Sequence, residues 1–268
     1  VIHSFHKIFP TFSQGSILHI CSDRVDTSKV EKAISILTTT SPFYPMLLTI
    51  SYTQDLLKRK GKELTHKMMN LGKKAQEELM KFNQESVLTQ DTIPKNYFFD
   101  TSKITVLTNC LGYTGFAVQK TLKKFGIGID CANPLGIIAP LGFGNTKEDI
   151  KAFVKAIKSL QPRKPIKFNN FYFPATPMEI VLSPREVFTK YKKKKVPIDE
   201  SVGYICAETI APYPPGIPVL LPGERITEEV VRYLKFIDNS KWKVFKYGKI
   251  QTNKLEFIRV IDISKEES

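Results

Sequence analysis

The sequence predicts an α/β protein, on three observations. Strand-like and helix-like segments alternate between residues 103 and 160, as expected for helices packed on a small sheet. A long segment, residues 46–82, repeats apolar side chains at helical spacing. The chain has 268 residues, of which 42% are hydrophobic and 25% charged, so it can form one large or two modest cores.

The first elements follow from periodicity and prolines. Residues 15–20 predict a short apolar strand, and residues 30–37 a helix. Pro42 and Pro45 interrupt regular structure in residues 38–45. Residues 46–82 predict an amphipathic helix that would break, if at all, near Gly61 or Gly72. Its apolar stripe consists of Leu57, Leu64, Met68, Leu71, Ala75 and Leu79.

A domain boundary is expected in the polar residues 83–100. Beyond it, the pattern predicts a strand at 103–107, a helix at 114–125, a strand within 128–140 and a helix at 146–160. Thr146 is a suitable N-cap for the last helix, with Asp149 three residues on. Its apolar face would hold Ile150, Phe153, Val154, Ile157 and Leu160.

The last hundred residues contain one unusual segment. After a basic linker at 161–173, Ser183 and Pro184 open a short helix. Residues 203–224 carry five prolines and two glycines in their second half, which predicts a rigid, extended loop of the kind that forms a pocket wall. A helix at 227–236 follows, then a hairpin at 242–263 around Gly248. We interpret Trp242 as a packing residue.

The net charge of +14 allows a nucleic-acid partner, but no helix-turn-helix, RNP or zinc pattern supports one, so none is expected. The one dense basic block, residues 192–195, is interpreted as a solvated loop, with a functional patch as the alternative.

No apolar run reaches the ~20 residues of a membrane span, and no signal peptide is recognisable, so no membrane association is expected. The four cysteines form neither a C-x-x-C nor a zinc pattern with the histidines. Buried, reduced thiols in the cytoplasm, and no metal site, are the expectation.

Four motifs occur along the chain in an order that indicates a known family. They are Ser4-Phe5-His6-Lys7, the segment Thr38 to Pro45, Gly112-Tyr113-Thr114-Gly115-Phe116, and Tyr213-Pro214-Pro215-Gly216-Ile217-Pro218 with Pro222-Gly223-Glu224. Together they resemble the ornithine/lysine/arginine decarboxylases that depend on pyridoxal 5'-phosphate (PLP) and have the aspartate-aminotransferase type of fold. The resemblance implies three parts: the end of a PLP-binding large domain (1–90), a small α/β domain (91–165) and a C-terminal decarboxylase domain (166–268).

The resemblance assigns cofactor roles to four residues. Lys7 would form the Schiff base with PLP, because a desolvated lysine amine is a good nucleophile. Ser4 and His6 would bind the phosphate. The alternative for His6 is that it positions the cofactor-binding residues without contacting the phosphate itself. Ser41 would donate to the phosphate across a subunit interface, and its alternative is a helix N-cap ahead of Pro42.

A basic substrate requires an acidic group at the far end of the pocket. Glu208, just before the proline-rich loop, is the candidate, and an ordinary ion pair or cap is its alternative. Tyr213 would line the same wall, or else pack in the core. The sequence does not choose among lysine, arginine and ornithine, since one methylene changes binding by only ~1–3 kcal/mol.

The resemblance also implies partners. In the family, an aspartate that pairs with the pyridine nitrogen and a histidine that stacks on the ring precede the cofactor lysine, and six residues before Lys7 cannot hold them. We therefore expect a separate N-terminal polypeptide or part that completes the cofactor domain. A homodimer or larger homo-oligomer with a shared active site is also expected. The alternative is a non-catalytic homologue or regulatory subunit of such a decarboxylase, and a basic nucleic-acid-binding module ranks third.

Overall fold

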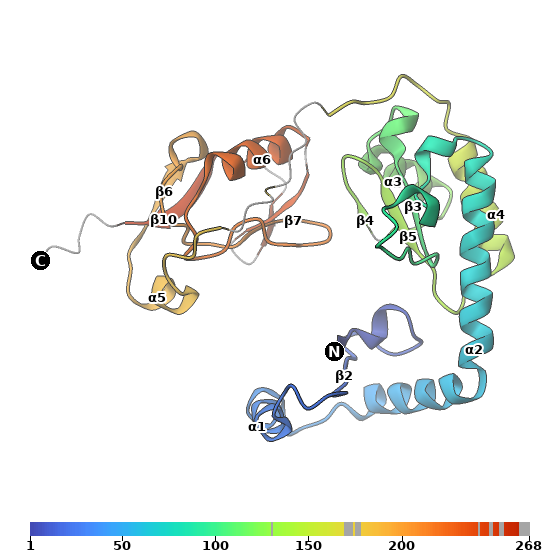
Figure 1. The fold of residues 1–268 in the computed structure, drawn as a ribbon, viewed down its shortest axis with the longest axis horizontal. Coiled ribbons are helices and arrows are strands. Elements are labelled where there is room, and N and C mark those ends of the chain that lie inside the picture. Colours follow the sequence, from blue (N-terminus) through green and yellow to red (C-terminus); the bar gives the residue numbers. More distant parts are fainter. Residues whose placement is uncertain are drawn as a thin grey trace, which may run out of the picture. The chain divides into compact units, whose positions relative to one another are not determined.

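The computed structural model describes residues 1–129, 131–168, 174, 178–240, 242–246, 249–251 and 255–262. These residues combine helices with small sheets, which confirms the α/β prediction (Figure 1). The chain divides into two compact units, one of residues Val1–Thr105 with Ala139–Leu160 and the other of Val106–Ile138 with Gln161–Ser268. The proposed division into three domains stays a prediction.

The helices and strands are short apart from one long helix. The α-helices are α1 (Thr27–Leu37), α2 (Tyr44–Met80), α3 (Gly115–Lys124), α4 (Lys147–Lys158), α5 (Pro184–Thr189) and α6 (Glu228–Asn239). The strands are β1 (Ile2–His3), β2 (Ile17–Leu18), β3 (Lys103–Val106), β4 (Cys131–Ala132), β5 (Ile137–Pro140), β6 (Lys193–Pro197), β7 (Ile210–Pro212), β8 (Val244–Lys246), β9 (Lys249–Gln251) and β10 (Phe257–Ile261). Their sheets have the orders β1-β2, β3-β5-β4, β10-β6 and β7-β8-β9.

Helices α2 and α4 form the core of the first unit. Leu71, Ala75 and Leu79 of α2 are at most 4% exposed, and the whole predicted apolar face of α4 is buried. The N-cap prediction for α4 is also confirmed, since Thr146 and Asp149 form a capping box. No break interrupts α2, but the helix bends where its ribbon passes from blue to teal (Figure 1).

The second unit has its main core around α6. Val230, Val231, Tyr233, Leu234 and Ile237 of this helix are all buried, and they pack with strands β6, β8 and β10. Thr227 caps the helix through its side chain, which accepts a hydrogen bond from the Val230 amide at 3.3 Å. The core therefore joins segments that are far apart in the sequence.

Three predictions about strands were wrong in part. Residues 128–140 hold two strands, β4 and β5, which pair antiparallel. The basic block is no loop, because Lys193–Pro197 forms β6 against β10 in an antiparallel ladder. The C-terminal residues are not one hairpin: β8 and β9 form it, while β10 pairs with β6. Gly248 itself lies outside the described residues.

The first 52 residues expose much apolar surface. Helix α1 buries none of its residues, and Ile36 and Leu37 are 70% and 84% exposed. Tyr44 and Leu48, at the start of α2, are exposed by 73% and 71%. The β1-β2 sheet next to them has only two strands. An exposed apolar area of this kind is typical of a surface that another polypeptide covers.

None of the four cysteines forms a disulfide in the described residues, in agreement with the predicted reduced state, but only Cys206 is buried. Cys21 is exposed and the other two are half-buried, so the prediction of buried thiols was wrong for these three. Burial raises the pKa of the Cys206 thiol to about 12, which keeps it protonated and unreactive. Within the described ranges, no helix has the length and apolar character needed to cross a membrane.

The glycine–aromatic turn depends on close backbone packing. Thr114 is the N-cap of α3, and its side chain accepts a hydrogen bond from the Ala117 amide at 3.3 Å. A Cβ atom on Gly115 would lie only 1.9 Å from the carbonyl oxygen of Gly136. No side chain fits at Gly115, because the backbone of the β4–β5 hairpin contacts the first turn of α3.

We predict that Gly115→Ala lowers the free energy of unfolding by about 1–3 kcal/mol, since the added methyl group forces the hairpin away. Gly144→Ala is the matched control, because a Cβ there meets nothing within 4 Å. Urea denaturation followed by circular dichroism measures both variants. Equal midpoints for the two variants would contradict the steric argument.

Candidate functional site

The turn that carries Lys7 is held by a cluster of aromatic rings. Residues Phe5–Lys7 form one turn of 3-10 helix, and Phe5 is only 4% exposed. The Phe5 and Phe9 ring centroids lie 4.6 Å apart, and His3 lies 5.5 Å from Phe9. Phe143 completes the cluster at 5.3 Å from Phe9. Burial of Phe5 therefore fixes the turn and leaves its polar residues outside.

Helix α2 anchors the loop that follows this turn. The hydroxyl of Thr53, a fully buried residue, donates to the carbonyl oxygen of Pro10 at 3.1 Å. The Thr49 hydroxyl accepts a hydrogen bond from the Phe12 amide at 3.3 Å. A long helix thus positions the lysine turn through two threonines.

Some polar groups of the turn are hydrogen-bonded and others are not. Nδ1 of His6 donates to the carbonyl oxygen of Gly15 at 2.8 Å, and the His6 backbone N–H donates to the same oxygen at 3.2 Å. Among the described residues, the Ser4 hydroxyl and the Lys7 amine make no hydrogen bond or ion pair, and both residues are exposed. The turn therefore presents Ser4, Lys7 and the second ring nitrogen of His6 to a ligand.

Ser41 lies on a different segment, between α1 and α2. It is exposed, and its backbone N–H donates to the Thr39 hydroxyl at 3.1 Å. The N-cap of α2 is Phe43, with Pro45 in the first turn, so the alternative role of Ser41 as a helix N-cap was wrong. Its cofactor role stays a prediction, as do those of Ser4, His6 and Lys7.

Glu208 is in the second unit and is 5% exposed. Its Oε1 accepts a hydrogen bond from the Arg259 backbone N–H at 2.6 Å and lies 3.2 Å from the amine of Lys246. Lys246 is itself buried and also donates to the carbonyl oxygen of Phe257. The structure thus contains the ion pair that was the alternative for Glu208. Its Oε2 is buried and has no hydrogen-bond partner among the described residues.

The proline-rich loop is closed and anchored at its base. The Ile210 N–H donates to the Leu220 carbonyl oxygen at 2.9 Å, and the Val219 N–H donates to the Ile210 carbonyl oxygen at 2.8 Å. The Tyr213 N–H donates to the Lys243 carbonyl oxygen at 2.8 Å. The half-buried Trp242 donates from its indole N–H to the Pro214 carbonyl oxygen at 3.2 Å, in line with its interpretation as a packing residue.

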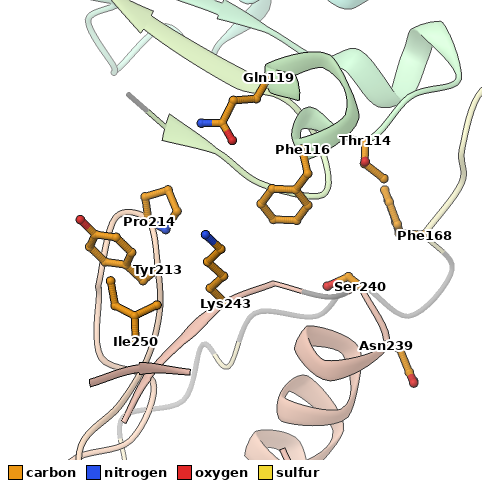
Figure 2. A pocket seen from close by; sticks show the side chains of 10 residues that line it. All are labelled: Thr114, Phe116, Gln119, Phe168, Tyr213, Pro214, Asn239, Ser240, Lys243 and Ile250. Carbon is orange, nitrogen blue, oxygen red and sulfur yellow. The ribbon is translucent and has the colours of Figure 1, made fainter. Parts of the chain in front are cut away.

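The loop forms one wall of a pocket of about 700 Å³, which confirms that it serves as a pocket wall. Figure 2 shows the Lys243 side chain extending between Pro214 and Phe116. Tyr213 lines the pocket and is 41% exposed, so its alternative role in core packing was wrong. The ten lining residues are Thr114, Phe116, Gln119, Phe168, Tyr213, Pro214, Asn239, Ser240, Lys243 and Ile250.

The charge of this pocket limits what it can bind. Lys243 is the one charged residue among these ten, so the described part of the lining offers no carboxylate to a basic side chain. Aromatic rings and a lysine amine suit an apolar or anionic group instead. Glu208 is not among the ten, so Glu208 and Tyr213 do not line this pocket together.

Sequence reasoning missed Lys243 and Lys246. A signal for Lys246 was present, because strand β8 alternates and places Lys246 on the same buried side as Val244. A lysine at a core-facing strand position requires a buried acidic partner. No comparable signal marked Lys243, whose role follows only from the position of the proline-rich loop.

Two family models match the chain. "Orn/Lys/Arg decarboxylase, major domain" matches residues 1–99, and "Orn/Lys/Arg decarboxylase, C-terminal domain" matches residues 168–244. The chain is 29% identical to an arginine decarboxylase of Halalkalibacterium halodurans over 87% of this chain and 48% of that protein. It is 26% identical to the inducible lysine decarboxylase of Escherichia coli K12, over 87% of this chain and 44% of that protein.

Solved structures share the fold of this chain. A lysine decarboxylase from Francisella novicida superimposes with a TM-score of 0.76 and 24% identity, over 97% of this chain and 48% of that one. The constitutive lysine decarboxylase of E. coli gives a TM-score of 0.74 at 19% identity. The chain spans about half the length of the curated relatives it matches. The motifs, the two family models and the shared fold together show that this chain belongs to the Orn/Lys/Arg decarboxylase family.

Proposed function

We propose that this chain takes part in the PLP-dependent decarboxylation of a basic amino acid (lysine, arginine or ornithine), with Lys7 as the residue that holds the cofactor. Family membership supports the reaction class. The observation that carries the role of Lys7 is its exposed, unengaged amine on a turn fixed by buried aromatic rings. An amine must be available in this way to attack the aldehyde of PLP.

The groups around Lys7 fit the cofactor. A phosphate group requires hydrogen-bond donors, and the Ser4 hydroxyl and the His6 ring stand on the same turn. The bond from His6 Nδ1 to Gly15 fixes the ring and leaves Nε2 for a ligand. Ser41 would add a further hydroxyl, across a subunit interface in our proposal.

When bound, PLP supplies the electron sink that makes loss of carbon dioxide feasible. The residues of this chain would hold the cofactor and orient the substrate. Lys7 would hold the cofactor through its amine, and the same amine would be the group that returns a proton to the substrate carbon. Orientation of the carboxylate and exclusion of water decide which bond of the substrate breaks.

We assign selection of the basic substrate to Glu208, and a second substrate contact to Tyr213, which lines the separate pocket beside the proline-rich loop. Lys246 already pairs with Oε1 of Glu208, whereas the buried Oε2 accepts no hydrogen bond from the described residues. A buried acceptor without a partner costs free energy, which an incoming ammonium or guanidinium group would recover.

We also propose that the apolar surface of residues 1–52 is covered by other polypeptides. A second copy of the chain and a polypeptide that completes the cofactor domain are the two partners we assign. The exposed residues of α1 and the two-stranded β1-β2 sheet support this, because a single hairpin is marginal by itself. The lack of a disulfide among the four cysteines in the described residues is in keeping with the cytoplasmic location that we propose.

The first prediction from this function concerns Lys7. Incubation with PLP followed by borohydride should leave a pyridoxyl adduct that peptide mass mapping locates on Lys7. Lys7→Arg should lose the adduct and its visible absorption band, whereas Lys29→Arg, at an exposed lysine on α1, should keep both. Adducts spread evenly over surface lysines in all three proteins would refute the assignment and favour the non-catalytic alternative.

A second prediction separates the two roles of Glu208. Glu208→Gln and Lys246→Met should each cost about 3–5 kcal/mol of stability, because each leaves one partner of a buried pair unmatched. The double variant should regain much of this loss in urea denaturation. In the catalytically competent assembly, the double variant should still show a raised KM for the basic amino acid. A KM unchanged in the stable double variant would show that Glu208 serves structure alone.

A third prediction concerns self-association. Sedimentation velocity should show the chain associating with rising concentration, and Leu37→Glu should weaken this, since it puts a charge on an 84% exposed apolar position. Ser35→Glu, also exposed on α1, is the matched control for charge. A monomer at all concentrations would argue against the homo-oligomer.

A further inference from the structure

A groove between α2 and α4 lies apart from the residues proposed for the cofactor and the substrate. It has a volume of about 600 Å³, within the range of small-molecule sites. All its lining residues belong to the first unit. They are Leu71, Lys74, Glu77, Glu78, Lys147, Ile150, Lys151, Val154, Lys155 and Lys158.

The floor of the groove is apolar. Leu71 of α2 is 4% exposed, and Ile150 and Val154 of α4 are 7% and 6% exposed. Ile150 and Val154 are four residues apart, so they form a continuous strip along α4. A hydrocarbon chain laid on this strip would bring its own apolar surface out of water and into contact with these side chains.

The α4 side of the rim is entirely basic. Lys147, Lys151 and Lys155 follow one another at intervals of four residues, so they stand on one face of the helix. All three are exposed, and in the part of the chain that the structure describes none of their side-chain amines makes an ion pair or hydrogen bond. Like charges at this spacing repel, and a bound anion would relieve that repulsion.

The acidic residues of the rim stand at one end. Glu78 is bonded to Lys81 at 2.6 Å and to Lys158 at 3.0 Å, and these lysines lower the pKa of its carboxyl group to about 2. It is therefore ionised and already paired. Glu77 is its neighbour in the sequence and lies at the same end of α2.

The two helices run in the same direction along the groove. Lys158 pairs with Glu78 near their C-terminal ends. At the start of α4, hydrogen bonds with Thr146 are the main cause that lowers the pKa of Asp149, and the charge of Lys67 on α2 contributes a smaller part. The groove thus has one end with Glu77 and Glu78, and an opposite end where Lys147 and Lys151 stand without an acidic lining residue.

We propose that this groove binds a small amphiphilic carboxylate, such as a medium-chain fatty acid. Its head group lies between Lys147 and Lys151, and its hydrocarbon tail lies on Ile150, Val154 and Leu71. The charge of the rim selects an anion and the floor selects an apolar body. The limited volume favours a small molecule over a folded partner.

The test uses three probes of equal chain length: decanoate, decanol and decylamine. Isothermal titration calorimetry with the full chain, below micelle-forming concentrations and at low salt, should rank the affinities in the order decanoate, decanol, decylamine. Added salt should weaken the binding of decanoate and leave that of decanol unchanged. Tighter binding of decylamine than of decanoate would overturn the proposal.

Charge reversal locates the site. Lys147→Glu/Lys151→Glu should weaken decanoate binding at least tenfold and strengthen decylamine binding. Lys120→Glu/Lys123→Glu, at exposed positions on α3, makes the same change in net charge outside the groove and should leave both affinities unchanged. Circular dichroism confirms that both variants remain folded.

Three outcomes contradict the proposal. Equal loss of decanoate binding in both double variants would mean that net charge, and not this groove, attracts the ligand. Unchanged binding in both would place the ligand elsewhere, such as on the apolar surface of residues 1–52. If an acidic amphipathic peptide bound the groove and decanoate did not, the groove would be a docking site for a helix instead.

Discussion

The second unit depends on one buried ion pair, between Glu208 and Lys246. A carboxylate taken out of water is tolerated only when it is paired, so this pair requires three segments to meet: the start of the proline-rich loop, strand β8 and strand β10. Separation of any of them would leave a charge buried alone. The same arrangement holds Tyr213 against the backbone of Lys243, and with it the wall of the pocket.

Close backbone contacts impose a second constraint. A Cβ atom on Gly72 would lie 1.9 Å from the Thr101 carbonyl oxygen, and one on Gly223 would lie 1.9 Å from that of Leu182. Gly223 also has a φ of +95°, which side chains other than hydrogen disfavour. Packing thus explains Gly115 of the glycine–aromatic turn and Gly223 of the C-terminal motif, independently of any role in catalysis.

Local patterns predicted the helices well and the strand pairing poorly. The stripes on α2 and α4 and the capping boxes at Thr146 and Ser183 depend on residues within a few turns of one another, so the sequence displays them directly. The pairing of β6 with β10 joins distant segments and leaves no such periodic sign, which is why residues 192–195 were misread as a loop. For the site, a motif indicated His6 and Lys7, and the position before the proline-rich loop indicated Glu208. The bond of His6 to Gly15 and the pairing of Glu208 with Lys246 join residues whose contact only the folded chain displays.

Helix α1 has a thermodynamic consequence for assembly. Because it buries no side chain, little apart from its internal hydrogen bonds opposes its local opening, and an isolated helix of 11 residues is marginal in water. The binding free energy of any partner that covers Ile34 and Leu37 must therefore also offset the cost in conformational entropy of ordering α1. Its affinity will be lower than the buried area alone would suggest, and assembly and local folding at this end of the chain will be a single coupled equilibrium.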